Sequence, residues 1–230
     1  NPGNLITNYS LLHKVVQAYN CGGMIQPSSS PMIGGYAGGP EGAALAHVTN
    51  TLLFTAAYQG DFYGGQILDT RYAGNCGREA LWAMSVSDQG INRNTHLLKL
   101  GMFDSVAGPC TEMVLYEDAV GVLNASASGG AYTIFPRSGG GKYIDWLTPQ
   151  ECKFCAEVAK RSAGMTRKQV NAIAKVLVPK YEGMLMNPPK GKGLRECYDL
   201  EASKPTQEWL DIYLKVKKEL IELGVPLEYP

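Results

Sequence analysis

The 230-residue chain is 45% hydrophobic and 18% charged, which is enough apolar sequence for one large domain with a full core. Its 21 basic and 21 acidic residues cancel, so the composition excludes the basic footprint of a nucleic-acid-binding domain. No apolar run approaches the ~18 residues of a membrane span, and no signal peptide is recognisable. Six cysteines in a chain of this length do not indicate a disulfide framework. Composition therefore predicts a cytoplasmic globular protein.

Helical spacing and prolines organise the first part of the chain. Residues 4–19 repeat apolar side chains with a helical period, and a glycine pair follows that favours a helix stop. Residues 24–26 (MIQ) form a short candidate strand. Residues 27–31 (PSSSP) are expected to form a loop, because proline cannot donate to a ladder of hydrogen bonds.

The glycine-rich stretch 34–42 (GGYAGGPEG) leads into an expected helix over residues 41–58. Such a stretch can place backbone N–H groups around an anion at a helix N-terminus, which would suit a phosphate-binding protein. The alternative is a flexible connection. The lack of a Walker lysine and of GxGxxG spacing favours the connection.

The central stretch of the chain has the order of a strand, a charged strand end, a glycine loop and a helix. The apolar run at 66–68 ends at Asp69 and Arg71, and an expected helix begins at Arg78 and Glu79. In parallel α/β folds, ligands bind at the carboxyl ends of strands. The alternative is that Asp69 and Arg71 pair with each other and serve only the scaffold.

A second strand of this kind is expected at 97–103 and ends at Asp104. Thr111 is placed to cap the helix that follows, with Glu112 in its first turn. Cys110, at this turn, is a candidate nucleophile or, more simply, a small buried residue.

The last third of the chain is predicted to be mainly helical. A weak strand is expected at 131–135, and three helices are expected at 149–163, 167–182 and 206–223. The two cysteines at 152 and 155 lie inside a helix with no second pair, which is a weak signal for zinc. No metal site is predicted.

These elements predict an α/β fold. Residues 1–147 supply strand–helix units, and residues 148–230 supply a helical segment packed on the same domain. Three or four strands are too few for a closed eight-stranded barrel, so the choices are part of a barrel or an open sheet.

Four motifs then carry a family resemblance: GGYAGG (34–39), RYAGNCGRE (71–79), AGPCTEM (107–113) and ECYD (196–199). In this order and spacing the chain resembles the C-terminal half of the monomethylamine:corrinoid methyltransferases of methanogenic archaea. The resemblance implies the C-terminal part of a (β/α)8 TIM-type barrel with a helical C-terminal extension. It further implies a homo-hexamer, and a methyl group passed to the cobalt(I) of a separate corrinoid protein. The family's pyrrolysine is expected only upstream of Asn1, so no cofactor is expected to bind this chain directly.

The chain departs from the family pattern at two positions of the pyrrolysine environment. Ser28 stands where the family has a glutamate, and Met102 stands where it has a glutamine. We expect Asp69, Arg71 and Asp104 to be catalytic, because each follows or ends a predicted strand. The expected pocket residues are Gln26, Ser28, Tyr36, Met102, Arg78, Glu79, Cys110 and Glu112.

The resemblance implies a methyltransferase that moves a methyl group from monomethylamine, or a related small methylated compound, to a corrinoid protein. The alternative is a non-catalytic assembly or interaction subunit that keeps the scaffold and docks a corrinoid protein. A phosphate-binding protein built on residues 34–39 is the third and weakest hypothesis. Neither a nucleic acid nor a membrane is expected as a partner.

Overall fold

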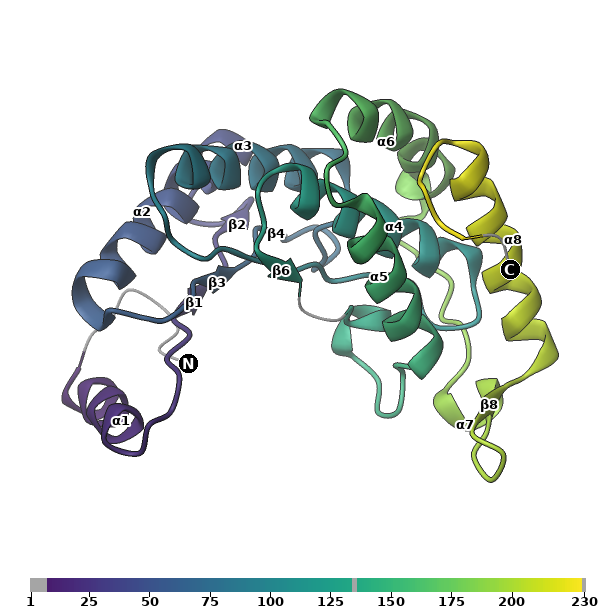
Figure 1. The fold of residues 1–230 in the computed structure, drawn as a ribbon, viewed down its shortest axis with the longest axis horizontal. Coiled ribbons are helices and arrows are strands. Elements are labelled where there is room, and N and C mark those ends of the chain that lie inside the picture. Colours follow the sequence, from purple (N-terminus) through teal and green to yellow (C-terminus); the bar gives the residue numbers. More distant parts are fainter. Residues whose placement is uncertain (1–7, 134–135, 229–230) are drawn as a thin grey trace.

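The computed structural model describes residues 8–133 and 136–228. Short strands lie side by side in four segments of the chain, namely 28–33, 64–69, 100–101 and 132–133 (Figure 1). All the pairings between these segments are parallel, and a bridge between Tyr63 and Lys99 joins the second segment to the third. The paired strands are β1 (Ser28–Ser29) with β3 (Gly64–Gly65), β2 (Met32–Ile33) with β4 (Leu68–Asp69), and β5 (Leu100–Gly101) with β6 (Tyr132–Thr133).

A helix follows each of the first three segments, and these helices lie on one face of the strands (Figure 1). They are α2 (Pro40–Tyr58), α3 (Arg78–Asn94) and α4 (Glu112–Ala127). α2 packs on α3, and α3 packs on α4. The predicted α/β fold is confirmed, although the strands of the described residues form no closed sheet.

The first strand was expected in the wrong place. Instead of residues 24–26, the segment 27–31 carries β1, and this corrects the expectation of a loop there. The two prolines are tolerated because only their carbonyl groups are used: Pro27 accepts from the Gly64 N–H and Pro31 from the Leu68 N–H. A proline can lie in a strand where its nitrogen is not required as a donor.

The helix expected at 4–19 is α1 (Tyr9–Asn20), which begins at an Asn8 cap whose side chain accepts from the Leu11 N–H. Residues 4–7 lie outside the described residues. Of the strand expected at 131–135, residues 132–133 form β6, and residues 134–135 lie outside the described residues.

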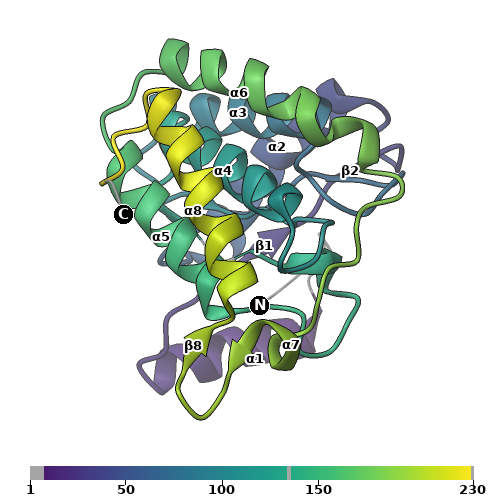
Figure 2. The ribbon, with the colours of Figure 1, turned by 90° about the vertical axis from the view of Figure 1, so that its right-hand side faces the viewer.

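The C-terminal helices gather around α4 (Figure 2). They are α5 (Pro149–Ser162), α6 (Arg167–Tyr181) and α8 (Gln207–Glu222), and a threonine precedes each one as its N-cap. Shorter elements join them: η1 (Ser138–Gly141), η2 (Glu182–Met184), α7 (Leu194–Cys197), and the antiparallel strands β7 (Tyr198–Asp199) and β8 (Lys204–Pro205). The pattern had predicted the helices but not this small strand pair.

Helix α4 is the centre of the core. Twelve of its sixteen residues are buried, so it meets protein on nearly every side. Phe103 at the end of the third strand segment packs on one side of it, and Trp209 of α8 belongs to the same apolar cluster. Between Met113 and Leu123 its sequence is apolar on all sides except for two buried acids, Glu117 and Asp118, and the buried Tyr116, which is the pattern of an enclosed helix.

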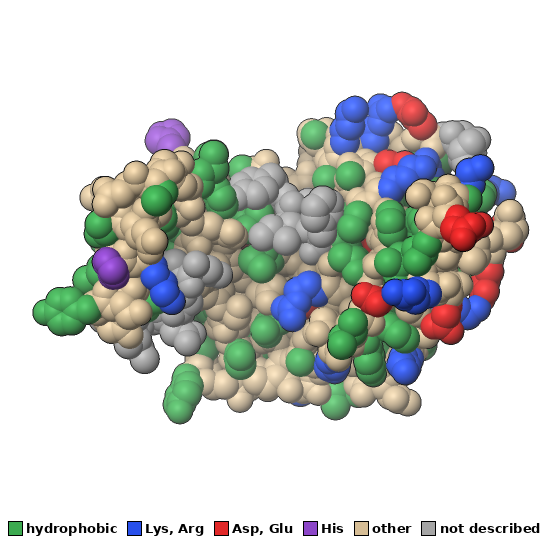
Figure 3. All heavy atoms as spheres, turned by 90° about the horizontal axis from the view of Figure 1, so that it is seen from below, with side chains coloured by type: hydrophobic (Ala, Val, Ile, Leu, Met, Phe, Trp, Pro, Cys, Tyr) green, Lys and Arg blue, Asp and Glu red, His purple; other side chains and the backbone are tan. Residues whose placement is uncertain are grey.

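Charged side chains are unevenly spread over the face seen in Figure 3. They gather over the C-terminal helices, at the right of the view, and are sparse over the rest. No helix in the described part of the chain is long and apolar enough to cross a membrane.

Adding a methyl group at two different helical glycines should change the stability of the fold in opposite directions. A Cβ at Gly121 of α4 would lie 2.8 Å from Phe103 Cγ, whereas a Cβ at Gly90 of α3 would meet nothing within 4 Å. We expect Gly121→Ala to lower the free energy of unfolding by about 1–3 kcal/mol through overpacking. The matched Gly90→Ala should raise it by up to about 1 kcal/mol through helix propensity. Urea denaturation measures both, and a Gly121→Ala variant as stable as Gly90→Ala would contradict this packing.

Candidate functional site

The strands have two faces, and one of them carries the candidate site. A Cβ at Gly65 would lie 2.8 Å from the ring of His47 on α2, so alternate residues from Gly65 face the helices. A Cβ at Gly64 would instead lie 2.5 Å from Gln26 Nε2 and 3.3 Å from Ser28 Cβ. We call this opposite side the inner face. Leu100 Cδ2 lies 3.1 Å from the same Cβ position, so by strand alternation this face carries Gln26, Ser28, Gln66, Leu100, Met102 and Asp104.

Asp104 is the centre of the inner face. Its buried carboxylate accepts a hydrogen bond from Gln66 Nε2 at 2.8 Å and from Arg137 Nη1 at 3.0 Å. Burial raises the pKa of Asp104 above its ordinary value, although Arg137 and Gln66 both act to lower it. The other amide atom, Gln66 Oε1, is buried and has no hydrogen-bond partner in the described part of the chain. The inner face therefore holds a carboxyl group beside an unused amide acceptor.

Buried side chains from elsewhere hold the backbone around Asp104. Asn75 Oδ1 accepts from the Asp104 N–H at 2.7 Å, and Asn75 Nδ2 donates to the Met102 carbonyl at 3.0 Å. Glu117 of α4 accepts from the backbone N–H groups of residues 106 and 107, both at 3.0 Å. Burial raises the pKa of Glu117 to about 8. The end of this strand is thus fixed from two directions.

Asp69 and Arg71 form an ion pair, as the scaffold alternative supposed. The Arg71 backbone N–H and Nε each donate to Asp69 Oδ1 at 2.9 Å, and the guanidinium also pairs with Glu79. Burial acts to raise the pKa of Asp69, but the hydrogen bonds from Arg71 outweigh it and hold the pKa below its ordinary value. The Asp69 side chain is fully buried while Arg71 is half exposed, so this trio closes the turn after β4.

The remaining expected site residues do not join the inner face. Arg78 pairs with Glu182 at 2.6 Å, and Glu112 pairs with Lys215 on α8. Cys110 is buried, and burial raises the pKa of its thiol, which disfavours a thiolate nucleophile. Tyr36 is fully exposed in the glycine-rich stretch. The structure therefore brings together Gln26, Ser28, Met102 and Asp104, and leaves the others elsewhere.

Metal binding finds no support in the described residues. No group of three or more His, Cys, Asp or Glu side chains there could hold a metal ion. Burial raises the pKa of the Cys152 and Cys155 thiols above their ordinary value.

Sequence patterns did not identify two residues that contact Asp104, namely Gln66 and Arg137. Arg137 follows the weak strand at 131–135, so the rule that ligands gather at strand ends would have found it. Gln66 begins the apolar run 66–68, and only strand alternation places its side chain on the same face as Asp104.

Comparisons with known proteins agree on one family. The family model described as monomethylamine methyltransferase MtmB matches residues 3–225. Monomethylamine methyltransferase MtmB of Methanosarcina mazei is 30% identical over 202 residues, which cover 88% of this chain and 44% of the relative. MtmB1 of Methanosarcina barkeri is 32% identical over 206 residues, with the same two coverages.

The crystal structure of the Methanosarcina barkeri monomethylamine methyltransferase (MtmB) superposes with a TM-score of 0.90 at 28% identity. The match covers 93% of this chain and 47% of that one. The crystal structure of a hydroxylamine MtmB complex matches equally well. The chain thus spans about half the length of the relatives it matches.

The buried carboxyl of Glu117 predicts a stability that declines with pH. Between its ordinary pKa of 4.5 and about 8, the folded chain keeps a proton that the unfolded chain releases. The free energy of unfolding contributed by this group therefore falls as pH rises through that window. Glu117→Gln should have a lower free energy of unfolding, since the amide cannot accept both backbone N–H groups. Its free energy of unfolding should also change less with pH, by a slope that corresponds to up to one proton.

Urea denaturation from pH 5 to pH 8 measures this slope. The matched control is Glu201→Gln, at an exposed position in the turn between β7 and β8, which should keep the wild-type slope. A Glu117→Gln slope equal to wild type would show that the carboxyl is ionised in the fold throughout.

Proposed function

The chain belongs to the monomethylamine methyltransferase MtmB family, and from that premise we propose that it takes part in methyl transfer from a small methylated amine to a corrinoid protein. Membership is the observation that carries the proposal, because the family match covers nearly the whole chain. The chain spans less than half of the M. mazei relative, so the activity of the whole protein is part of the proposal.

We propose that the strand–helix units of residues 1–147 are the C-terminal part of a (β/α)8 barrel. Three features support this: the strands are parallel and in chain order, the helices lie on one face, and the inner face holds the hydrogen-bonded pair Gln66 and Asp104. In a barrel the inner face would turn toward the axis, and Asp104, near a strand's carboxyl end, would lie at the mouth. Residues 148–230 would be a helical segment packed against α4.

The chemistry of the inner face suits a small cationic substrate. A methylammonium group has N–H donors and positive charge, and Asp104 and the free Gln66 Oε1 are acceptors for both. Arg137 would keep the Asp104 carboxylate available by opposing the effect of burial on its pKa. We assign Asp104 and Gln66 to positioning the substrate nitrogen and holding a proton as the methyl group leaves.

The inner face does not fit the surroundings of pyrrolysine that the family resemblance implies. The family's glutamate and glutamine positions hold Ser28 and Met102 here, which can supply neither the charge nor the amide. We therefore derive no step through pyrrolysine. The corrinoid would come on a separate protein, and a hexamer remains a proposal by analogy. The six cysteines are free, which suits a reducing cytoplasm.

The same two departures favour the alternative, a non-catalytic subunit that docks a corrinoid protein. Assembly needs the scaffold but not the pocket, so loss of the glutamate and glutamine would be tolerated. Methyl transfer to cobalt decides between the two.

The first test is methyl transfer by the native protein with its cognate corrinoid protein. We expect the cobalt(I) absorbance to be lost and methyl-cobalt absorbance to appear with a methylated amine. Asp104→Asn should slow this by about 10²-fold, a magnitude typical of losing one positioned polar group. The control is Asp211→Asn, an exposed position on α8. Copurification of the corrinoid protein without transfer from any methylated amine or betaine would establish the docking subunit instead.

Restoring the family residues tests the substrate. We expect Ser28→Glu combined with Met102→Gln to shift the kcat/KM preference toward monomethylamine over dimethylamine and trimethylamine, because a carboxylate and an amide return to the inner face. The same assay measures it, with each single variant as control. An unchanged preference would show that these positions do not face the substrate.

A further inference from the structure

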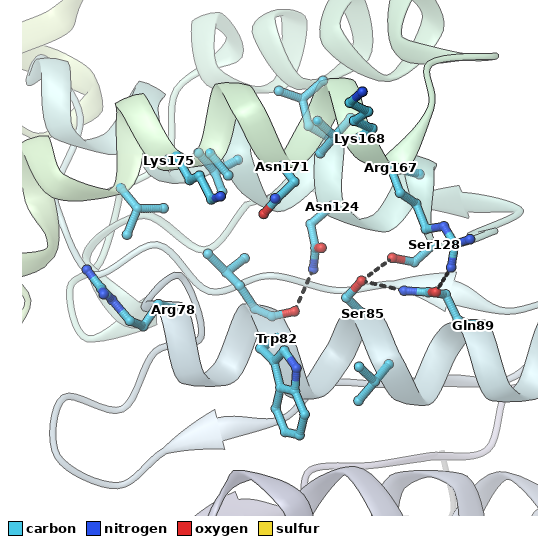
Figure 4. Close-up of a pocket in the computed structure, with 18 of the residues that line it drawn as sticks. Arg78, Trp82, Ser85, Gln89, Asn124, Ser128, Arg167, Lys168, Asn171 and Lys175 are labelled. Carbon is cyan, nitrogen blue, oxygen red and sulfur yellow. Dashed lines mark hydrogen bonds between the residues drawn. The ribbon is translucent and has the colours of Figure 1, made fainter.

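A groove runs across the helical layer on the side of α3 and α4 that faces away from the strands. Its volume is about 840 Å³, and it has α3 and α6 as walls with α4 between them (Figure 4). Along each wall the lining residues recur every three or four positions, from Arg78 to Gln89 on α3 and from Arg167 to Pro179 on α6. At 1.5 Å per residue these runs are roughly 16–18 Å long, about three helical turns.

The floor of the groove is apolar and its edges are polar. Leu81, Val120, Leu123, Val170 and Val178 line it from the three helices. Hydrogen bonds along the α3 side tie the edge together, including Asn124 Nδ2 to the Leu81 carbonyl at 3.0 Å and Gln89 Nε2 to Ser85 Oγ at 2.9 Å (Figure 4). The groove is therefore a built feature with fixed walls.

The charge of the groove is entirely positive. Arg78, Arg167, Lys168 and Lys175 line it, and no aspartate or glutamate does, in a chain whose net charge is zero. Arg78 is paired with Glu182, and Arg167 donates to Gln89. Lys168 and Lys175 are exposed and take part in no ion pair within the described residues. The unpaired ammonium groups of Lys168 and Lys175 thus lie about two turns apart on α6, beside the apolar floor.

We propose that this groove binds an acidic amphipathic helix of a partner protein. An apolar floor three turns long matches one face of a helix, whose anchors recur at i, i+3 or i+4, and i+7. Lys168 and Lys175 would meet carboxylates that flank those anchors, which sets orientation and speeds encounter. A small anion would use one end of the groove and leave the apolar floor exposed. The length and the floor favour a helix over such a ligand.

The probe for this surface is a fluorescein-labelled, helix-stapled peptide of sixteen residues, with leucines at the anchor spacing and glutamates beside them. Fluorescence anisotropy with the native protein should give saturable binding. Lys168→Glu combined with Lys175→Glu should weaken it at least tenfold. The matched control, Lys160→Glu with Lys218→Glu, changes two exposed lysines outside the groove and should leave the affinity within twofold.

A second variant tests the floor without changing charge. Ala174→Trp places a large ring in the groove and should also weaken binding at least tenfold, with circular dichroism confirming the fold. The proposal is overturned if a scrambled peptide binds equally well, or if inorganic phosphate or tetraglutamate competes as well as the peptide. It is also overturned if light scattering shows self-association that the double lysine variant abolishes, since the occupant would then be a second copy.

Discussion

The carboxyl of Glu117 connects the enclosed helix α4 to the end of the strand that carries Asp104. It accepts two successive backbone N–H groups, at residues 106 and 107, and it does so without contact with water. A buried carboxyl of this kind is costly to desolvate and is tolerated only when such hydrogen bonds satisfy it. The position of Asp104 on the inner face therefore depends on how α4 is packed, and α4 is packed by the C-terminal helices.

This dependence explains why the helical segment after residue 148 matters to a site that it does not line. Helices α5, α6 and α8 enclose α4. At the start of α5, the buried Glu151 carboxylate accepts a hydrogen bond from the Thr148 backbone N–H at 2.9 Å. Burial raises the pKa of Glu151 to about 7, and the charges of Glu151 and Glu117 both add to the effect of burial in raising the pKa of Asp118 on α4. The C-terminal helices thus set both the inner face and, through α6, one wall of the basic groove on the opposite side of α4.

Local patterns predicted the elements well and the side-chain partners poorly. Helical periodicity and capping threonines placed α2, α4, α5, α6 and α8 within a few residues. The proline rule misplaced β1, because it treats proline as excluded from pairing when only its nitrogen is. Strand ends identified Asp104, and Asp69 proved to be the partner of Arg71. Gln66 and Arg137 were missed because Gln66 reaches Asp104 from another strand segment and Arg137 reaches it from the loop after β6.

By itself the sequence determined the α/β class, the order of helices, the absence of a strong metal motif and the family resemblance, since each rests on local spacing or ordered motifs. Only the tertiary structure decided which polar residues share a face, which ion pairs serve the scaffold and where cations stand unpaired. The physical reason is that strand alternation and helix packing bring together residues tens of positions apart. Gln66 donates a hydrogen bond to Asp104, and Lys175 of α6 lines the same groove as Arg78 of α3, although no local pattern encodes either arrangement.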